Sequence, residues 1–278
     1  MMTINCNGIL LDLTTPRVMG IVNLTPDSFY AESRTQTEEE ITRRTLEVSS
    51  QGADIIDVGA YSSRPGAEDV TCEEEMRRLR HGLGIIKRLL PNSIVSVDTF
   101  RADVAKMCVE EYGVDIINDI AAGGLDENMF ATVASLNVPY IIMHMKGNPR
   151  TMQISPHYDD IIGEVTLYFS EKINKLRDMG VNDIIIDPGF GFSKTTDHNF
   201  QLLSRMQELS LFNLPILVGI SRKSMIYRTL NISPQQSLNG TTMLNTISLE
   251  KGANILRVHD VAECVEVIKL YKKLKTSN

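Results

Sequence analysis

The sequence predicts an α/β protein, a (β/α)8 barrel of the TIM-barrel type that is preceded by a short N-terminal β-hairpin. Apolar runs of strand length alternate with amphipathic helical segments along the whole chain, in eight strand–helix units. Each helix must return the chain to the same end of the sheet, so the strands are expected to be parallel. Eight units in 278 residues fit a closed barrel. An open doubly wound sheet is the alternative, although the dinucleotide fingerprint GxGxxG is absent after the first strand.

The expected barrel strands are apolar runs without polar alternation, which is typical of strands buried on both faces. Before them, residues 3–13 contain Asn7-Gly8, the dipeptide preferred in tight type I′ hairpins. From its position we expect this hairpin to cover the amino-terminal end of the barrel. The second barrel strand is expected to end at Asp57. The strand segments are VMGIVN (18–23), ADIIDVG (53–59), SIVSVD (93–98), VDIIND (114–119), VPYIIMHM (138–145), DIIID (183–187), PILVGISRKS (215–224) and ANILRVHD (253–260).

Two of the expected helices begin with a capping box, Thr37 with Glu40 and Thr71 with Glu74. The others are indicated by apolar residues at helical spacing. The chain shows no shift in composition, linker or low-complexity tract, so one domain over 1–278 is expected, with the hairpin in 1–15 and the barrel in 16–275. The helices are expected at 37–50, 71–90, 101–112, 126–136, around 162–176, at 197–208, in segments up to 250, and from 261.

Composition restricts the function. The formal net charge is −7 and no long basic run is present, which disfavours a nucleic acid as partner. Four scattered cysteines without a CxxC pair indicate core thiols in a reducing compartment. The sequence begins without a secretory signal pattern, and no apolar run approaches membrane-spanning length. The cytoplasm is therefore the expected location.

Polar residues recur where the buried strands give way to loops. In a barrel these positions converge on one face. For a single Asp or Asn, helix capping and ligand binding are equally good explanations. Capping explains Asp57 poorly because its helix begins well downstream, whereas it remains open for Asp98. The set comprises Asn23, Asp57, Asp98, Asn118, Asp187, the turn Ser221-Arg222-Lys223, and Arg257 with His259.

These side chains would be costly to desolvate together unless a ligand pairs with them. Carboxylates and amides suit a ligand rich in N–H donors. Arginine, lysine and histidine suit an anion, most simply a phosphate. The sequence therefore predicts a ligand with a flat, amidine-like heterocycle at one end and a phosphate at the other.

Eight ordered motifs, each at an expected strand end, resemble those of the dihydropteroate synthase family of pterin-binding barrels. They cover nearly the whole chain. The motifs are GIVNLTPDSF (20–29), DVGAYSSRPGA (57–67), SVDT (96–99), INDI (117–120), MHMKGNP (143–149), DPGFGF (187–192), GISRKS (219–224) and LRVHD (256–260).

The resemblance implies a transferase of folate biosynthesis that joins 6-hydroxymethyl-7,8-dihydropterin diphosphate to 4-aminobenzoate and releases pyrophosphate. It implies catalytic roles for Asp98, Lys223 and Arg257, and a Mg²⁺ ion held by Asn23. It also implies a homodimer and competition by sulfonamides. The implied pterin site is Asp98, Asn118, Asp187, Lys223, Arg257 and Met143; the diphosphate site is Ser63, Arg64, Arg257 and His259; and the aminobenzoate site is Phe29, Pro65, Phe192 and Ser224.

The chain departs from the family pattern in two loops. Ser63 stands where relatives carry threonine, which keeps a hydroxyl, and Tyr30-Ala31-Glu32-Ser33 replaces an Asp-Gly-Gly run. A methyltetrahydrofolate methyltransferase-type barrel is one rival, but it has no use for the cationic set. A silent pterin-binding paralogue is expected to lack the loops that this chain keeps. A sugar-phosphate lyase or isomerase would need a Schiff-base lysine inside a strand, and Lys223 lies in a turn.

Overall fold

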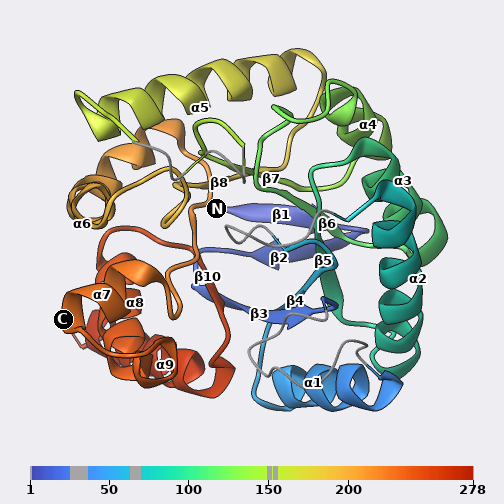
Figure 1. Ribbon diagram of the computed structural model, residues 1–278, viewed down its shortest axis with the longest axis horizontal. Coiled ribbons are helices and arrows are strands. Elements are labelled where there is room, and N and C mark those ends of the chain that lie inside the picture. The colour runs from blue at the N-terminus through green and yellow to red at the C-terminus, as the bar shows by residue number, and fades with distance from the viewer. Residues whose placement is uncertain (1, 26–36, 63–69, 149–151, 153–155, 278) are drawn as a thin grey trace.

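The computed structural model describes residues 2–25, 37–62, 70–148, 152 and 156–277 as a barrel of parallel strands surrounded by helices (Figure 1). The eight barrel strands lie in the order β8-β7-β6-β5-β4-β3-β10-β9. A parallel bridge between Ile186 and Ile216 joins the two outer strands and closes the ring. The barrel strands are β3 (Arg17–Asn23), β4 (Ile55–Gly59), β5 (Ile94–Asp98), β6 (Ile116–Asp119), β7 (Tyr140–Met143), β8 (Ile184–Asp187), β9 (Leu217–Val218) and β10 (Ile255–Val258).

The helices form the outer layer and pack on the outward-facing side chains of the strands in one continuous core. Thr37 opens the first helix with both bonds of its capping box, as predicted. The helices are α1 (Glu38–Ser50), α2 (Cys72–Leu89), α3 (Ala102–Tyr112), α4 (Met129–Leu136), α5 (Ile161–Asp178), α6 (Thr196–Arg205), η1 (Met206–Phe212), α7 (Ser224–Leu230), η2 (Pro234–Gln236), α8 (Leu238–Glu250) and α9 (Val261–Lys275). Within the described ranges, no helix combines the length and apolarity that crossing a membrane requires.

The hairpin of β1 (Thr3–Cys6) and β2 (Ile9–Asp12) closes the amino-terminal end of the barrel, as expected. It lies across the centre of the ring in Figure 1. Ile4, Cys6 and Leu11 pack on the first inward-facing residues of the strands in a second apolar cluster. Asn7 anchors the turn by donating a 2.8 Å hydrogen bond to Asp115. Because this end is filled, the polar strand residues beyond it can be reached only from the carboxyl end.

Two local predictions were wrong. Strand β4 continues to Gly59, so Asp57 lies in mid-strand and not at the strand end. The capping box at Thr71 is half formed, because the Glu74 carboxylate binds Arg77 and Arg78 instead of returning to the cap. Strand β7 covers Tyr140–Met143, within the apolar run 138–145, and ends at Met143.

Candidate active site

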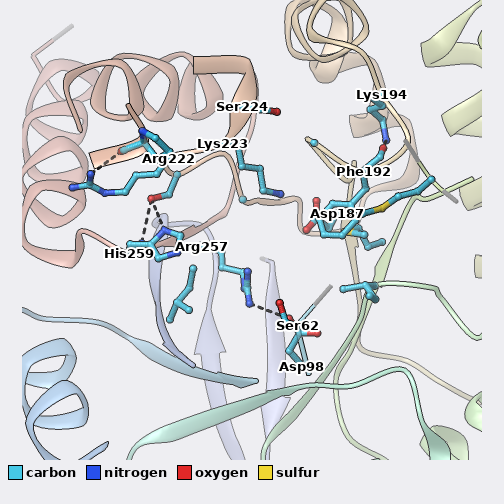
Figure 2. A pocket seen from close by; sticks show the side chains of 18 of the residues that line it. Ser62, Asp98, Asp187, Phe192, Lys194, Arg222, Lys223, Ser224, Arg257 and His259 are labelled. Atoms are coloured by element: carbon cyan, nitrogen blue, oxygen red, sulfur yellow. Dashed lines mark hydrogen bonds and ion pairs between the residues drawn. The ribbon is translucent and has the colours of Figure 1, made fainter. Parts of the chain in front are cut away.

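A pocket of about 990 Å³ opens at the carboxyl ends of the strands (Figure 2). It collects residues from all eight barrel strands or the loops that follow them. Four predicted site residues, Phe29, Ser63, Arg64 and Pro65, lie outside the described residues, as do Tyr30–Ser33. Every other predicted site residue lines the pocket: Asn23, Asp98, Asn118, Met143, Asp187, Phe192, Lys223, Ser224, Arg257 and His259.

Arg257 is held between two carboxylates on the floor of the pocket. Its Nε lies 2.6 Å from Oδ2 of Asp57, and its Nη2 lies 3.0 Å from Oδ2 of Asp98. Asp57 is fully buried, and Nδ2 of Asn118 lies 3.4 Å from its Oδ2. Since a buried carboxylate is stable only when it is paired, Asp57 serves as the fixed counter-ion that orients the guanidinium.

The remaining carboxylates of the floor, Asp98 and Asp187, both have a raised pKa. Desolvation raises the pKa of Asp98 to about 7, against the attraction of Arg257 and with the help of the neighbouring Asp57 charge. Desolvation also raises the pKa of Asp187, while Lys223 acts in the opposite direction. Such shifts concentrate at functional sites, because a ligand that brings donors or positive charge would reverse them.

Lys223 faces Asp187 across the pocket from the turn after β9 (Figure 2). Its Nζ donates a 2.5 Å hydrogen bond to the carbonyl of Phe190 and lies 4.7 Å from the centroid of the Phe192 ring. Desolvation lowers the pKa of Lys223 to about 8, although Asp187 opposes the shift. The cation is therefore placed between an aromatic ring and a carboxylate, where a flat heterocycle with both donors and acceptors would fit.

The loop after β8 presents Phe192 to the pocket. Asp187 starts it by accepting a 2.8 Å hydrogen bond from the backbone N–H of Gly189. Gly189 has φ +73°, and a Cβ there would lie 2.1 Å from the carbonyl oxygen of His144. Gly191 has φ +81°. Only glycine can adopt the positive φ at position 189 and also avoid the clash with the His144 carbonyl. These constraints explain the Pro-Gly-Phe-Gly run in physical terms.

His259 and Ser221 form a polar pair at the opposite side of the floor. The Ser221 hydroxyl accepts a hydrogen bond from the His259 backbone N–H, and it lies 3.1 Å from His259 Nδ1. Desolvation and the charge of Arg257 lower the pKa of His259 to about 4. His259 is thus neutral at pH 7, and if the hydroxyl donates to Nδ1 the ring proton is on Nε2. It would then offer an anion a hydrogen bond and no full charge.

The donor set for a metal ion is small. Among the described residues, no group of three or more His, Cys, Asp or Glu side chains could hold one. Asn23 lines the pocket with a single amide oxygen at the end of β3, beside Asp98 across Gly59. Mg²⁺ commonly keeps several waters and binds one or two protein oxygens together with substrate phosphates. The amide oxygen of Asn23, next to a site for an anion, is consistent with this mode of Mg²⁺ coordination.

Two functional contributions escaped the sequence reasoning. Asp57 was recognised as an unusual polar residue, but its role as the partner of Arg257 was missed; strand alternation, which places 55, 57 and 59 on one face, could have revealed it. Lys194 is buried and lines the pocket, and no sequence signal distinguished it from an ordinary surface lysine. His144 is also buried, and its Nδ1 lies 3.0 Å from Lys194 Nζ.

Comparison with known proteins places these features in a family. Residues 19–259 match the family model described as "Pterin binding enzyme". Dihydropteroate synthase of Escherichia coli (strain K12) is 40% identical over 273 residues, which cover 97% of this chain and 95% of that protein. A sulfonamide complex of Yersinia pestis dihydropteroate synthase superposes with a TM-score of 0.92 at 37% identity, covering 99% of this chain and 100% of the other. The Xanthomonas albilineans enzyme in complex with 7,8-dihydropteroate gives 0.83 at 33% identity, covering 99% of both chains.

Proposed function

The chain belongs to the pterin binding enzymes and, among them, to the dihydropteroate synthase family, and we propose that it joins 6-hydroxymethyl-7,8-dihydropterin diphosphate to 4-aminobenzoate with release of pyrophosphate. One observation carries the proposal: the carboxylate and amide set and the cationic set meet in a single pocket. This is the ligand pattern that the strand ends predicted, a donor-rich heterocycle at one side and an anion at the other.

Asp187, Asn118 and Lys223 are suited to the amino-pyrimidine edge of the pterin. Asp187 accepts one hydrogen bond from Gly189 N–H, and a carboxylate can accept several more. Met143 supplies an apolar wall beside them. The N–H groups of an amidine-like edge would donate hydrogen bonds to the Asp187 carboxylate and offset the cost of its desolvation. These hydrogen bonds would therefore favour binding of the pterin.

Breaking the carbon–oxygen bond separates charge, and the pocket has a group for each fragment. The bonding pair leaves with the diphosphate, whose growing charge meets Arg257 and a hydrogen bond from His259. The methylene carbon becomes cationic, and the Asp98 carboxylate is placed to stabilise it. The arylamine nitrogen then forms the new bond to that carbon and gives up a proton to solvent or phosphate. No covalent intermediate on the protein is needed.

We infer that Mg²⁺ accompanies the diphosphate and that Asn23 is its protein ligand. When bound, the ion would neutralise charge on the leaving group. Phe192 and Ser224 are suited to frame the aminobenzoate, with the aromatic ring against the substrate ring and the hydroxyl near its carboxylate. Ser63, Arg64, Pro65 and Phe29 stay predictions, as do the homodimer, the cytoplasmic location and the extent of the single domain.

A reaction that counts both products tests the proposal. The protein with Mg²⁺ and both substrates should release one pyrophosphate for each 7,8-dihydropteroate, as measured by coupled phosphate detection and chromatography. Omitting either substrate should stop both products. Pyrophosphate release at an equal rate without 4-aminobenzoate would identify a hydrolase and refute the proposal.

A further inference from the structure

Lys194 is a buried lysine that the reaction outlined above does not use. Lys194 is 3% exposed, and hydrogen-bond acceptors from two segments of the chain surround its Nζ. Nζ lies 3.0 Å from the carbonyl oxygens of Gly189 and Phe192 and 3.0 Å from His144 Nδ1, and it lies 3.4 Å from the His144 carbonyl. Burying a lysine is costly, so a position with this many converging acceptors indicates a specific role.

The acceptors explain how the loop after β8 obtains its shape. Positive φ values at Gly189 and Gly191 turn successive peptide planes in different directions. The Gly189 and Phe192 carbonyls consequently point to Lys194, whereas the Phe190 carbonyl between them accepts from Lys223. Two lysines thus bind one loop through different carbonyls, and Figure 2 shows Lys194 reaching the loop from the side away from Lys223.

The neutral state of the neighbouring His144 ring is consistent with this arrangement. Burial, Lys194 and Lys146 lower the pKa of His144 well below its usual value, so its Nδ1 can accept a hydrogen bond. Desolvation lowers the pKa of Lys194 to about 7, and Asp187 acts in the opposite direction. Lys194 therefore links the end of β7 to the loop carrying Phe192.

We propose that Lys194 is a positioning residue for the arylamine: by drawing the Gly189 and Phe192 carbonyls to one point beside His144, it fixes the Phe192 ring against Lys223 where 4-aminobenzoate binds. The identity of the ligand in this inference rests on the proposed function. The role of Lys194 in fixing the loop geometry is independent of that function. The pterin side of the pocket depends on Asp187 and Asn118, which do not contact Lys194 Nζ within hydrogen-bond distance.

The substitution Lys194→Met tests the proposal because the fold should survive it. The Gly189 carbonyl would keep its 3.1 Å bond from Phe192 N–H, and the Phe192 carbonyl would keep its 2.8 Å bond from the Ser193 hydroxyl. Neither buried carbonyl is left without a donor. Should the variant fail to fold, Lys194→Leu, which also removes every N–H donor of the side chain, replaces it under the same criteria.

Lys146→Met is the matched control. Lys146 lies two residues after His144, is more exposed, and pairs with Glu164 outside the pocket. Lys194→Met should raise the KM for 4-aminobenzoate about tenfold or more, as a misplaced binding group does. The KM for the pterin diphosphate should stay within about twofold in both variants, since uniform loss would mean general damage. Equal rises for both substrates, or no rise for 4-aminobenzoate, would overturn the proposal.

A second readout needs no substrate. The chain has no tryptophan, so Phe192→Trp places a single fluorophore on the loop. Adding Lys194→Met should increase acrylamide quenching of that fluorophore, and adding Lys146→Met should not. Unchanged quenching would overturn the proposed fixation of the loop. If the wild-type protein makes no dihydropteroate while quenching responds as expected, the proposed function fails and the loop role of Lys194 stands.

Discussion

Replacing Asp57 with asparagine tests how far the pocket depends on a residue that touches no substrate. Asp57→Asn keeps the shape of the side chain but removes the charge that holds Arg257 Nε at 2.6 Å. A hydrogen bond to a charged group contributes about 1.5–3 kcal/mol and a neutral one about 0.5–1.5 kcal/mol. We therefore expect the free energy of unfolding to fall by about 1–2 kcal/mol, measured by urea denaturation.

The same change should reach the reaction through two side chains. Of the two carboxylates that hold Arg257 only Asp98 would remain, and kcat/KM for the pterin diphosphate should fall about 30-fold, equivalent to about 2 kcal/mol of transition-state stabilisation. The Asp57 charge also helps raise the pKa of Asp98. Without it, the acid limb of the pH profile of kcat/KM should move from near pH 7 to lower pH.

Asp54→Asn is the control. Asp54 pairs with Arg17 at 2.9 Å at the amino-terminal end of the barrel, far from the pocket lining. It should cost stability and leave kcat/KM and the acid limb unchanged. If Asp57→Asn behaves in the same way, with kcat/KM within about twofold of wild type, Asp57 does not orient Arg257 for the reaction and the reasoning fails.

Asp98→Asn should lower kcat by about two to three orders of magnitude and abolish the acid limb. In the folded protein the pKa of Asp98 is raised to about 7, so folding favours the protonated carboxyl. The stability that this group contributes is present at acidic pH and is lost as the pH rises through 7. Urea denaturation of the variant should not show that loss. Gly189→Ala should lower the free energy of unfolding far more than Gly180→Ala. Both glycines have positive φ, but a Cβ at Gly189 would clash with the His144 carbonyl, whereas one at Gly180 would meet nothing within 4 Å. Equal urea midpoints for the two variants would refute the packing argument. EDTA should abolish pyrophosphate release and added Mg²⁺ should restore it, with Asn23→Ala requiring more Mg²⁺ for half-maximal activity; full activity in EDTA would remove the metal from the mechanism.

The fold was accessible from sequence because its signals are local and repeated. Isoleucine- and valine-rich runs predict buried parallel strands wherever they occur in the chain. The pair Thr37 and Glu40 predicts the start of a helix from two residues three positions apart. The barrel mouth followed, since the carboxyl ends of parallel strands must converge. The sequence alone therefore groups Asp98, Asn118, Asp187 and Arg257 at one end of the barrel.

The parts that were missed depend on contacts distant in sequence. Asp57 orients a guanidinium 200 positions away, and a strand end drawn two residues early hid its inward direction. Lys194 bends back beneath the loop that precedes it, so its burial results from the turns at Gly189 and Gly191. The Glu74 carboxylate had competing partners in Arg77 and Arg78, and charge pairing prevailed over capping.

The central claim is that one pocket separates charge, with Asp98 facing the methylene carbon and Arg257 with His259 facing the departing diphosphate. The most direct test is the secondary kinetic isotope effect of pterin diphosphate deuterated at that methylene, measured on kcat/KM at limiting 4-aminobenzoate. A clearly normal effect, with the deuterated substrate reacting more slowly, is predicted because the carbon becomes trigonal and cationic. An effect indistinguishable from unity would mean that the amine bonds as the diphosphate leaves, and would contradict the cation-stabilising pocket.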